Sequence, residues 1–78
     1  MTLQEAINEF TAMAAAKGLE AVDLSDDYTL QIEYRKNGRN VGGVSYIGSA
    51  ENPDNVGLPA SEFTMAKKQI KYLAAKHA

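Results

Sequence analysis

Hydrophobic and polar positions follow two different periods along the chain, and each change of period separates two elements. Apolar residues recur every three or four positions over residues 3–17, every second position over residues 28–35, and every three or four positions again over residues 59–76. The longer spacing is typical of an amphipathic helix, and strict alternation is typical of a half-buried strand. The pattern therefore predicts two helices that flank a small sheet.

The first helix has a start signal and a stop signal. Thr2 and Glu5 have the spacing of a capping box, in which each side chain accepts a hydrogen bond from the backbone N–H of the other residue. Gly18 stands where a helix commonly ends in a left-handed residue, and Leu19 can then fold back over Ala14. We predict a helix over residues 3–17.

The middle of the chain predicts three strands. Residues 19–24 form a short first strand, followed by a turn at Ser25–Asp27. Residues 28–35 alternate between apolar and polar side chains and form the second strand. The dipeptide Asn37–Gly38 is a strong hairpin signal, so residues 40–47 return as the third strand.

The register of this hairpin has two solutions. With a two-residue loop, Val41 and Ile47 lie on the apolar face of the preceding strand. Val44 and Tyr46 then point away from that face. A three-residue loop that includes Lys36 reverses the assignment, because a slip of one residue moves every side chain to the other face.

Two segments rich in glycine interrupt the pattern. Gly42 and Gly43 fall inside the third strand, where they indicate a β-bulge or the close approach of another backbone. Residues 48–58 contain Gly, Pro, Asn and Asp without periodicity, which predicts a loop. Pro59 suits the first turn of the second helix, over residues 59–76. The element order is α-β-β-β-α, which defines an α+β fold with a small antiparallel sheet packed on two helices.

Length and composition set limits on the class of protein. The 78 residues make a single small domain, 1–78, with a limited core, so a partner or a homodimer is expected to add stability. The sequence has no cysteine, which excludes disulfides, thiolate zinc sites and a cysteine nucleophile. No apolar run approaches about 18 residues, and the N-terminus lacks the basic and apolar regions of a secretory signal. We expect a cytoplasmic protein without a membrane partner.

Catalytic groups are scarce. His77 is the only histidine and lies next to the last residue, where a helix terminus favours it for electrostatic reasons alone. The acidic turn between Asp23 and Asp27 lacks the glycine and the distal glutamate of a calcium loop. Gly38, Gly42 and Gly43 lie inside a hairpin and not between a strand and a helix, so they do not form a phosphate loop. We expect no enzymatic activity, no cofactor and no metal.

Charge is distributed unevenly along the chain. Residues 1–33 carry seven acids and one base, whereas residues 34–78 carry three acids and seven bases. The acidic half can occupy a basic nucleic-acid groove on another protein, and an exposed tyrosine of the hairpin is a favoured anchor for protein contacts. The residues expected to bind a protein partner, or a nucleoprotein complex, are Glu5, Glu9, Asp23, Asp26, Asp27, Tyr46, Glu51 and Asp54.

The second helix carries a motif that resembles a known family. Residues 67–75, KKQIKYLAA, are similar to the KKxAKxxAA signature in the second helix of double-stranded-RNA-binding domains. The α-β-β-β-α order is similar as well, and residues 7–10, INEF, resemble the first-helix motif. The chain departs from the family by the insertion of residues 48–66 and by its acidic first turn. The resemblance implies that lysines of the second helix contact phosphates. The residues of this alternative nucleic-acid surface are Arg35, Lys36, Arg39, Lys67, Lys68 and Lys71.

The chain also resembles, in general style, the small phage-encoded inhibitors that include anti-CRISPR proteins. The shared features are a capped helix, a hairpin, a second helix and the absence of catalytic groups. We therefore expect a non-catalytic protein-binding module that inhibits or regulates its partner. Binding to a nucleic-acid duplex is the alternative, and a homodimer formed through exposed strand edges is the third hypothesis.

Overall fold

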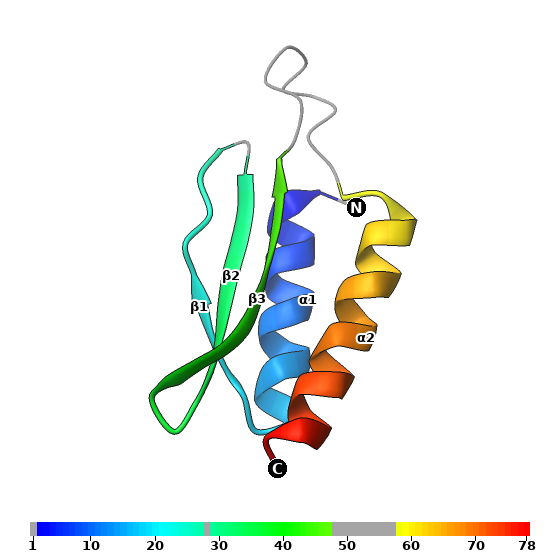
Figure 1. Ribbon diagram of the computed structural model, residues 1–78. Coiled ribbons are helices and arrows are strands. Elements are labelled where there is room, and N and C mark those ends of the chain that lie inside the picture. Colours follow the sequence, from blue (N-terminus) through cyan, green and yellow to red (C-terminus); the bar gives the residue numbers. More distant parts are fainter. Residues whose placement is uncertain (1, 28, 48–57) are drawn as a thin grey trace.

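The computed structural model describes residues 2–27, 29–47 and 58–78 and confirms the α+β architecture (Figure 1). The three strands form one antiparallel sheet in the order β1-β2-β3. Neither helix of the described residues is long and apolar enough to cross a membrane. The elements, in chain order, are α1 (Leu3–Ala16), β1 (Glu20–Asp23), β2 (Thr29–Lys36), β3 (Arg39–Ile47) and α2 (Ala60–Lys76).

Both helices cover the same face of the sheet. Helix α1 packs on β1 and β2, whereas α2 packs on β3 and on α1 (Figure 1). Strand β2 supplies the largest part of the sheet side of the core, and the rings of Phe10 and Phe63 stack between the helices with their centroids 5.2 Å apart. The buried residues are Leu3, Ala6, Ile7, Phe10, Ala14, Leu19, Leu30, Ile32, Tyr34, Leu58, Ala66, Ile70 and Leu73.

The two ends of α1 have the caps that the sequence predicts. The Glu5 N–H donates to Thr2 Oγ1 and the Thr2 N–H donates to Glu5 Oε1, both at 3.1 Å. At the other end, Gly18 has a φ of +80°, and the Leu19 N–H donates to the Ala14 carbonyl at 2.8 Å. The capping box and the C-terminal motif are therefore confirmed, and the helix ends one residue earlier than predicted.

The hairpin turn has two residues. Asn37 and Gly38 both have positive φ values, 54° and 78°, and Lys36 pairs with Arg39 across them. The register then shifts by one residue, because Tyr34 pairs with Gly42. A β-bulge at the third strand is therefore present beside the glycine pair, as the sequence predicts.

The bulge reverses the face that the turn alone would give. Val44 pairs with Ile32 and Tyr46 pairs with Leu30, so both side chains point towards the helices and are partly buried. Ile47 points away from the helices and is 76% exposed. The expectation that a two-residue loop leaves Tyr46 outward is wrong, because the extra residue in β3 slips the register once more.

Both glycines of β3 are sites of close approach. A Cβ atom on Gly42 would lie 2.7 Å from Leu73 Cδ1 of α2, and one on Gly43 would lie 2.8 Å from the Ile32 carbonyl oxygen. These residues therefore let α2 approach β3 and let the bulged strand approach β2. Helix α2 begins one residue later than predicted, with Pro59 as its N-cap residue. Of the predicted loop, residues 48–57 lie outside the described residues, as does Tyr28.

Tyr34 is fully buried, and its hydroxyl has no hydrogen-bond partner among the described residues. Burial raises the pKa of Tyr34 to about 12, because the phenolate loses its solvation inside the core. In the unfolded chain the same group ionises near its ordinary pKa of about 10. The unfolded state therefore loses this proton first as the pH rises, and the fold loses stability between pH values of about 10 and 12.

Replacing Tyr34 by phenylalanine tests this assignment. We expect Tyr34→Phe to raise the free energy of unfolding by about 1 kcal/mol at pH 7, because it removes a buried polar group without a partner. Between pH 7 and 11, the wild type should lose about 1.4 kcal/mol more than the variant. Urea unfolding at both pH values measures this difference. Tyr72→Phe, at an exposed site, is the matched control, and equal pH profiles for wild type and Tyr34→Phe would contradict the assignment.

Candidate partner-binding surfaces

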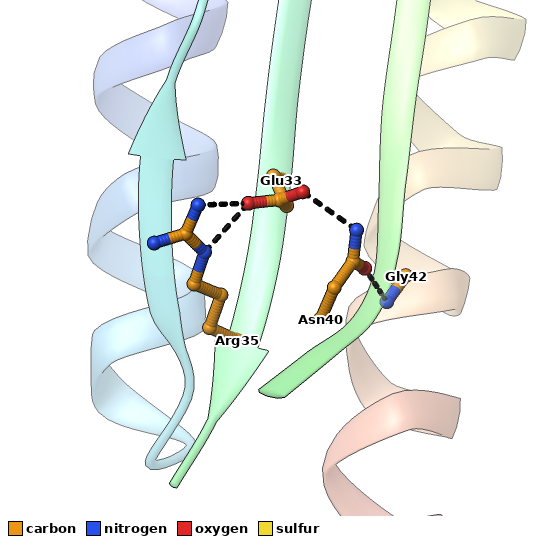
Figure 2. Close-up of polar contacts among 4 residues, drawn as sticks. All are labelled: Glu33, Arg35, Asn40 and Gly42. Atoms are coloured by element: carbon orange, nitrogen blue, oxygen red, sulfur yellow. Dashed lines mark hydrogen bonds and ion pairs between the residues drawn. The ribbon is translucent and has the colours of Figure 1, made fainter. Parts of the chain in front are cut away.

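A polar network on the outer face of the sheet holds the bulge (Figure 2). Asn40 Oδ1 accepts from the Gly42 N–H at 3.0 Å, while Asn40 Nδ2 donates to Glu33 Oε1 at 2.6 Å. The other Glu33 oxygen accepts from Arg35 Nε at 2.6 Å and also forms an ion pair with this guanidinium. Asn40 thus spans the irregular part of the ladder and connects β3 to β2.

The network also decides the role of Arg35. Its charge is compensated by Glu33, and its side chain lies on the face of the sheet that is turned away from both helices. The lysines of α2 lie on the opposite side of the sheet. The structure therefore does not bring Arg35 together with Lys67, Lys68 and Lys71, although the sequence grouped them into one candidate surface.

The acids of three separate elements gather at one end of the molecule. The start of α1, the connection from β1 to β2 and the start of α2 lie together at this end (Figure 1). We call the set the acidic end, and among the described residues no lysine or arginine belongs to these three segments. Its exposed members are Glu5, Asp26, Asp27 and Glu62, and Glu9 follows one turn further along α1. Asp23 is exposed as well, but it pairs with Ile32 and therefore lies halfway along β2.

Two of these carboxylates also shape the backbone. The Thr2 N–H that donates to Glu5 holds the pKa of this carboxyl below its ordinary value, so Glu5 is charged at neutral pH. Asp26 Oδ1 accepts from the Thr29 N–H at 2.7 Å and closes the connection between β1 and β2. Asp27 is exposed in the same connection and makes no such contact with described residues, so it is available for a partner.

Basic residues lie at the other end, where the hairpin and the C-terminal ends of both helices meet (Figure 1). Lys36 Nζ donates to the Gly18 carbonyl at 3.3 Å, which places a cation at the C-terminus of α1. Lys36, Arg39 and His77 line an open concavity of about 560 Å³. The uneven charge of the sequence thus becomes a separation of charge along the molecule.

The three lysines of α2 are exposed in the middle of that helix. Lys67 Nζ lies 5.0 Å from the centre of the Phe63 ring, and none of the three has a carboxylate within ion-pair distance among the described residues. The helix places Lys67 and Lys71 one turn apart on the same side. They remain candidates for phosphate contacts.

The sequence analysis did not identify two exposed apolar residues of α2, of which Met65 lies beside β3. Met65 and Tyr72 are 65% and 62% exposed, and they lie seven residues apart on one face of α2. The available signal was that both residues fall outside the three-to-four spacing of the buried positions of this helix. Tyr46, expected as an anchor, instead lies on the inner face of the sheet, and Glu51 and Asp54 lie outside the described residues.

Comparison with known proteins adds no assignment. No family model, no curated protein and no solved structure matches this chain. Among the described residues, no group of three or more histidine, aspartate or glutamate side chains is arranged to hold a metal ion. The surfaces themselves therefore carry the functional argument.

Replacing Asn40 tests the network that holds the bulge. We expect Asn40→Ala to lower the free energy of unfolding by about 1–2 kcal/mol, because it removes two hydrogen bonds and leaves the Gly42 N–H without its partner. Asn8→Ala is the control, since Asn8 only accepts an exposed side-chain hydrogen bond from Gln4. Urea unfolding of both variants checks the prediction. Equal losses would show that Asn40 does not support the bulge.

Proposed function

We propose that this protein is a small non-catalytic protein-binding module that inhibits or regulates a partner by occupying its surface. The acidic end carries the proposal, since it combines carboxylates from α1, the connection from β1 to β2, and α2. A cluster of one sign of charge attracts a partner of the other sign and accelerates their association. The partner is then a protein with a basic surface.

A basic nucleic-acid groove is the partner surface that fits this end best. Carboxylates presented from several rigid elements can take the place of phosphates along such a groove. The partner can therefore be a nucleoprotein complex whose nucleic acid this protein displaces. An anti-CRISPR-like phage inhibitor, acting in the cytoplasm, is the sharpest form of the proposal, and the small size and the acidic end support it.

Binding to a nucleic-acid duplex is the second candidate. The α-β-β-β-α layout with three antiparallel strands is consistent with a double-stranded-RNA-binding domain, and Lys67, Lys68 and Lys71 are exposed on α2. Membership of that family would place these lysines against phosphates. The acids in the connection from β1 to β2 oppose this role, because they would face the same polyanion.

Charge reversal at the acidic end tests the first candidate. We expect Asp27→Lys to weaken capture of the partner from the native host by about tenfold, because one attraction becomes a repulsion. Glu20→Lys changes the net charge equally but lies at the start of β1, so it should retain capture. Capture with and without nuclease separates a protein partner from a nucleic-acid tether. Equal capture by both variants would exclude the acidic end as the binding surface.

A duplex titration tests the second candidate. Fluorescence anisotropy with a 20-base-pair RNA duplex at low salt should show binding. The logarithm of the association constant should fall linearly with the logarithm of the salt concentration, more steeply the more phosphates are contacted. The triple variant with Lys67, Lys68 and Lys71 changed to glutamine should lose this binding, whereas Arg35→Gln should retain it. Absence of binding to the wild type at low salt would remove this candidate.

A further inference from the structure

The second half of β3 has backbone groups that point away from the sheet. Gln31 of β2 accepts from the Leu24 N–H at 2.8 Å and donates its own N–H to Ser25 Oγ at 2.8 Å. Both backbone groups of Gln31 therefore point towards β1. Because Ser45 is the β3 partner of Gln31, the Ser45 N–H and carbonyl point to the free edge of the sheet.

The same argument applies at Ile47 and extends the open edge. Thr29, its partner on β2, donates to Asp26 Oδ1 at 2.7 Å and accepts from the Asp26 N–H at 3.0 Å, so it also faces β1. At Gly43 the edge is covered, since the carbonyl accepts from Gln69 Nε2 at 2.8 Å. On this edge, no hydrogen bond joins the backbone of Ser45 or Ile47 to another described residue.

The two edges of the sheet differ in their protection. Strand β1 has four residues and carries acidic side chains at both ends, Glu20 and Asp23. The last four residues of β3, 44–47, carry no charge. Short length and charge normally keep an edge strand from pairing with another chain, and the bulge protects only the hairpin half of β3. The outer half of β3 is therefore suited to accept a further strand.

A groove accompanies this edge. It has a volume of about 300 Å³ and runs between residues 43–45 of β3 and the first turns of α2. Ala66 is buried at its base and Val44 is partly buried, whereas Met65 is exposed on its rim. Among the described residues that line the groove, Glu62 is the only charged one. The groove can hold an apolar side chain beside a basic one.

We propose that an extended segment of the partner protein adds to β3 as a fourth strand and places its side chains in this groove. The proposal rests on the proposed protein-binding function and specifies its mode. Main-chain hydrogen bonds from Ser45 and Ile47 supply affinity, and alternate side chains supply specificity. The segment carries an apolar residue towards Met65 and a lysine or arginine towards Glu62, because the groove lies at the acidic end.

A peptide of matched chemistry tests the strand addition directly. The probe is the capped peptide Thr-Lys-Thr-Val-Thr-Lys-Thr, added to the full ¹⁵N-labelled protein, because its valine and both lysines lie on one face of a strand and can enter the groove together. Amide shifts should concentrate in residues 43–47 and 62–69, and amide hydrogen exchange at Ser45 and Ile47 should slow. The same peptide, N-methylated at alternate residues on its pairing edge, keeps every charge and should bind about tenfold more weakly, because it lacks the donors of a ladder.

Substitution at Ser45 provides the matched variants. Ser45→Pro removes the Ser45 N–H, an edge donor that does not pair with β2, and should weaken binding of the peptide by about tenfold. Ser45→Ala keeps the donor and should bind as the wild type does. Equal binding of the plain and the N-methylated peptide, shifts confined to other elements, or no binding at millimolar peptide would overturn the proposal. The peptide pair decides the question on the wild type even if Ser45→Pro fails to fold.

The same variants separate this inference from the proposed function. If capture of the partner is lost in Asp27→Lys but retained in Ser45→Pro, the acidic end binds the partner and strand addition is overturned. If both variants retain capture, strand addition and protein binding through the acidic end are both excluded. Loss in Ser45→Pro with retention in Ser45→Ala supports strand addition.

Discussion

The β-bulge next to Gly42 is the constraint on which the arrangement of the sheet depends. Asn40 holds it by accepting from the Gly42 N–H and donating to Glu33 across the strand pair. Because a slip of one residue exchanges the two faces of a strand, the bulge turns Val44 and Tyr46 towards the helices. Without it, two bulky apolar side chains would leave a core that is already small. The bulge therefore contributes to stability through the register it imposes, in addition to its own hydrogen bonds.

Local signals in the sequence were sufficient for the elements and their order. The capping box, Gly18 and Asn37–Gly38 each act within a few residues, and each has the predicted conformation. The face of β3 was not predictable from such signals, since it depends on a contact between Asn40 and Glu33, seven residues apart, and on the approach of Leu73 to Gly42. The glycine pair indicated an irregularity without specifying which residue would be left unpaired.

The sequence predicted that the candidate surfaces are charged, but it did not predict which residues each surface brings together. Asymmetric charge indicated an acidic surface, but Glu62 joins it from the half of the chain that is rich in bases. Arg35 was expected to bind phosphate, and it is compensated by Glu33 because both side chains share the outer face of β2. The groove beside β3 had no counterpart in the sequence pattern, since it depends on how closely α2 approaches the edge.

The acidic end and the part of β3 that can pair with a further strand lie at the same end of the molecule. They do so because the bulge disturbs the other half of β3. The bulge interrupts the regular pairing of the hairpin half of β3, where the basic residues lie. Gln69 covers the edge of the sheet at Gly43. The regular half of the strand continues towards the acidic end, and there the backbone groups of Ser45 and Ile47 are directed outward. Long-range attraction governs how fast a basic segment arrives, whereas short-range hydrogen bonds govern how long it stays. A basic extended segment would therefore be drawn to the half of the edge that can pair with it and repelled from the half that cannot.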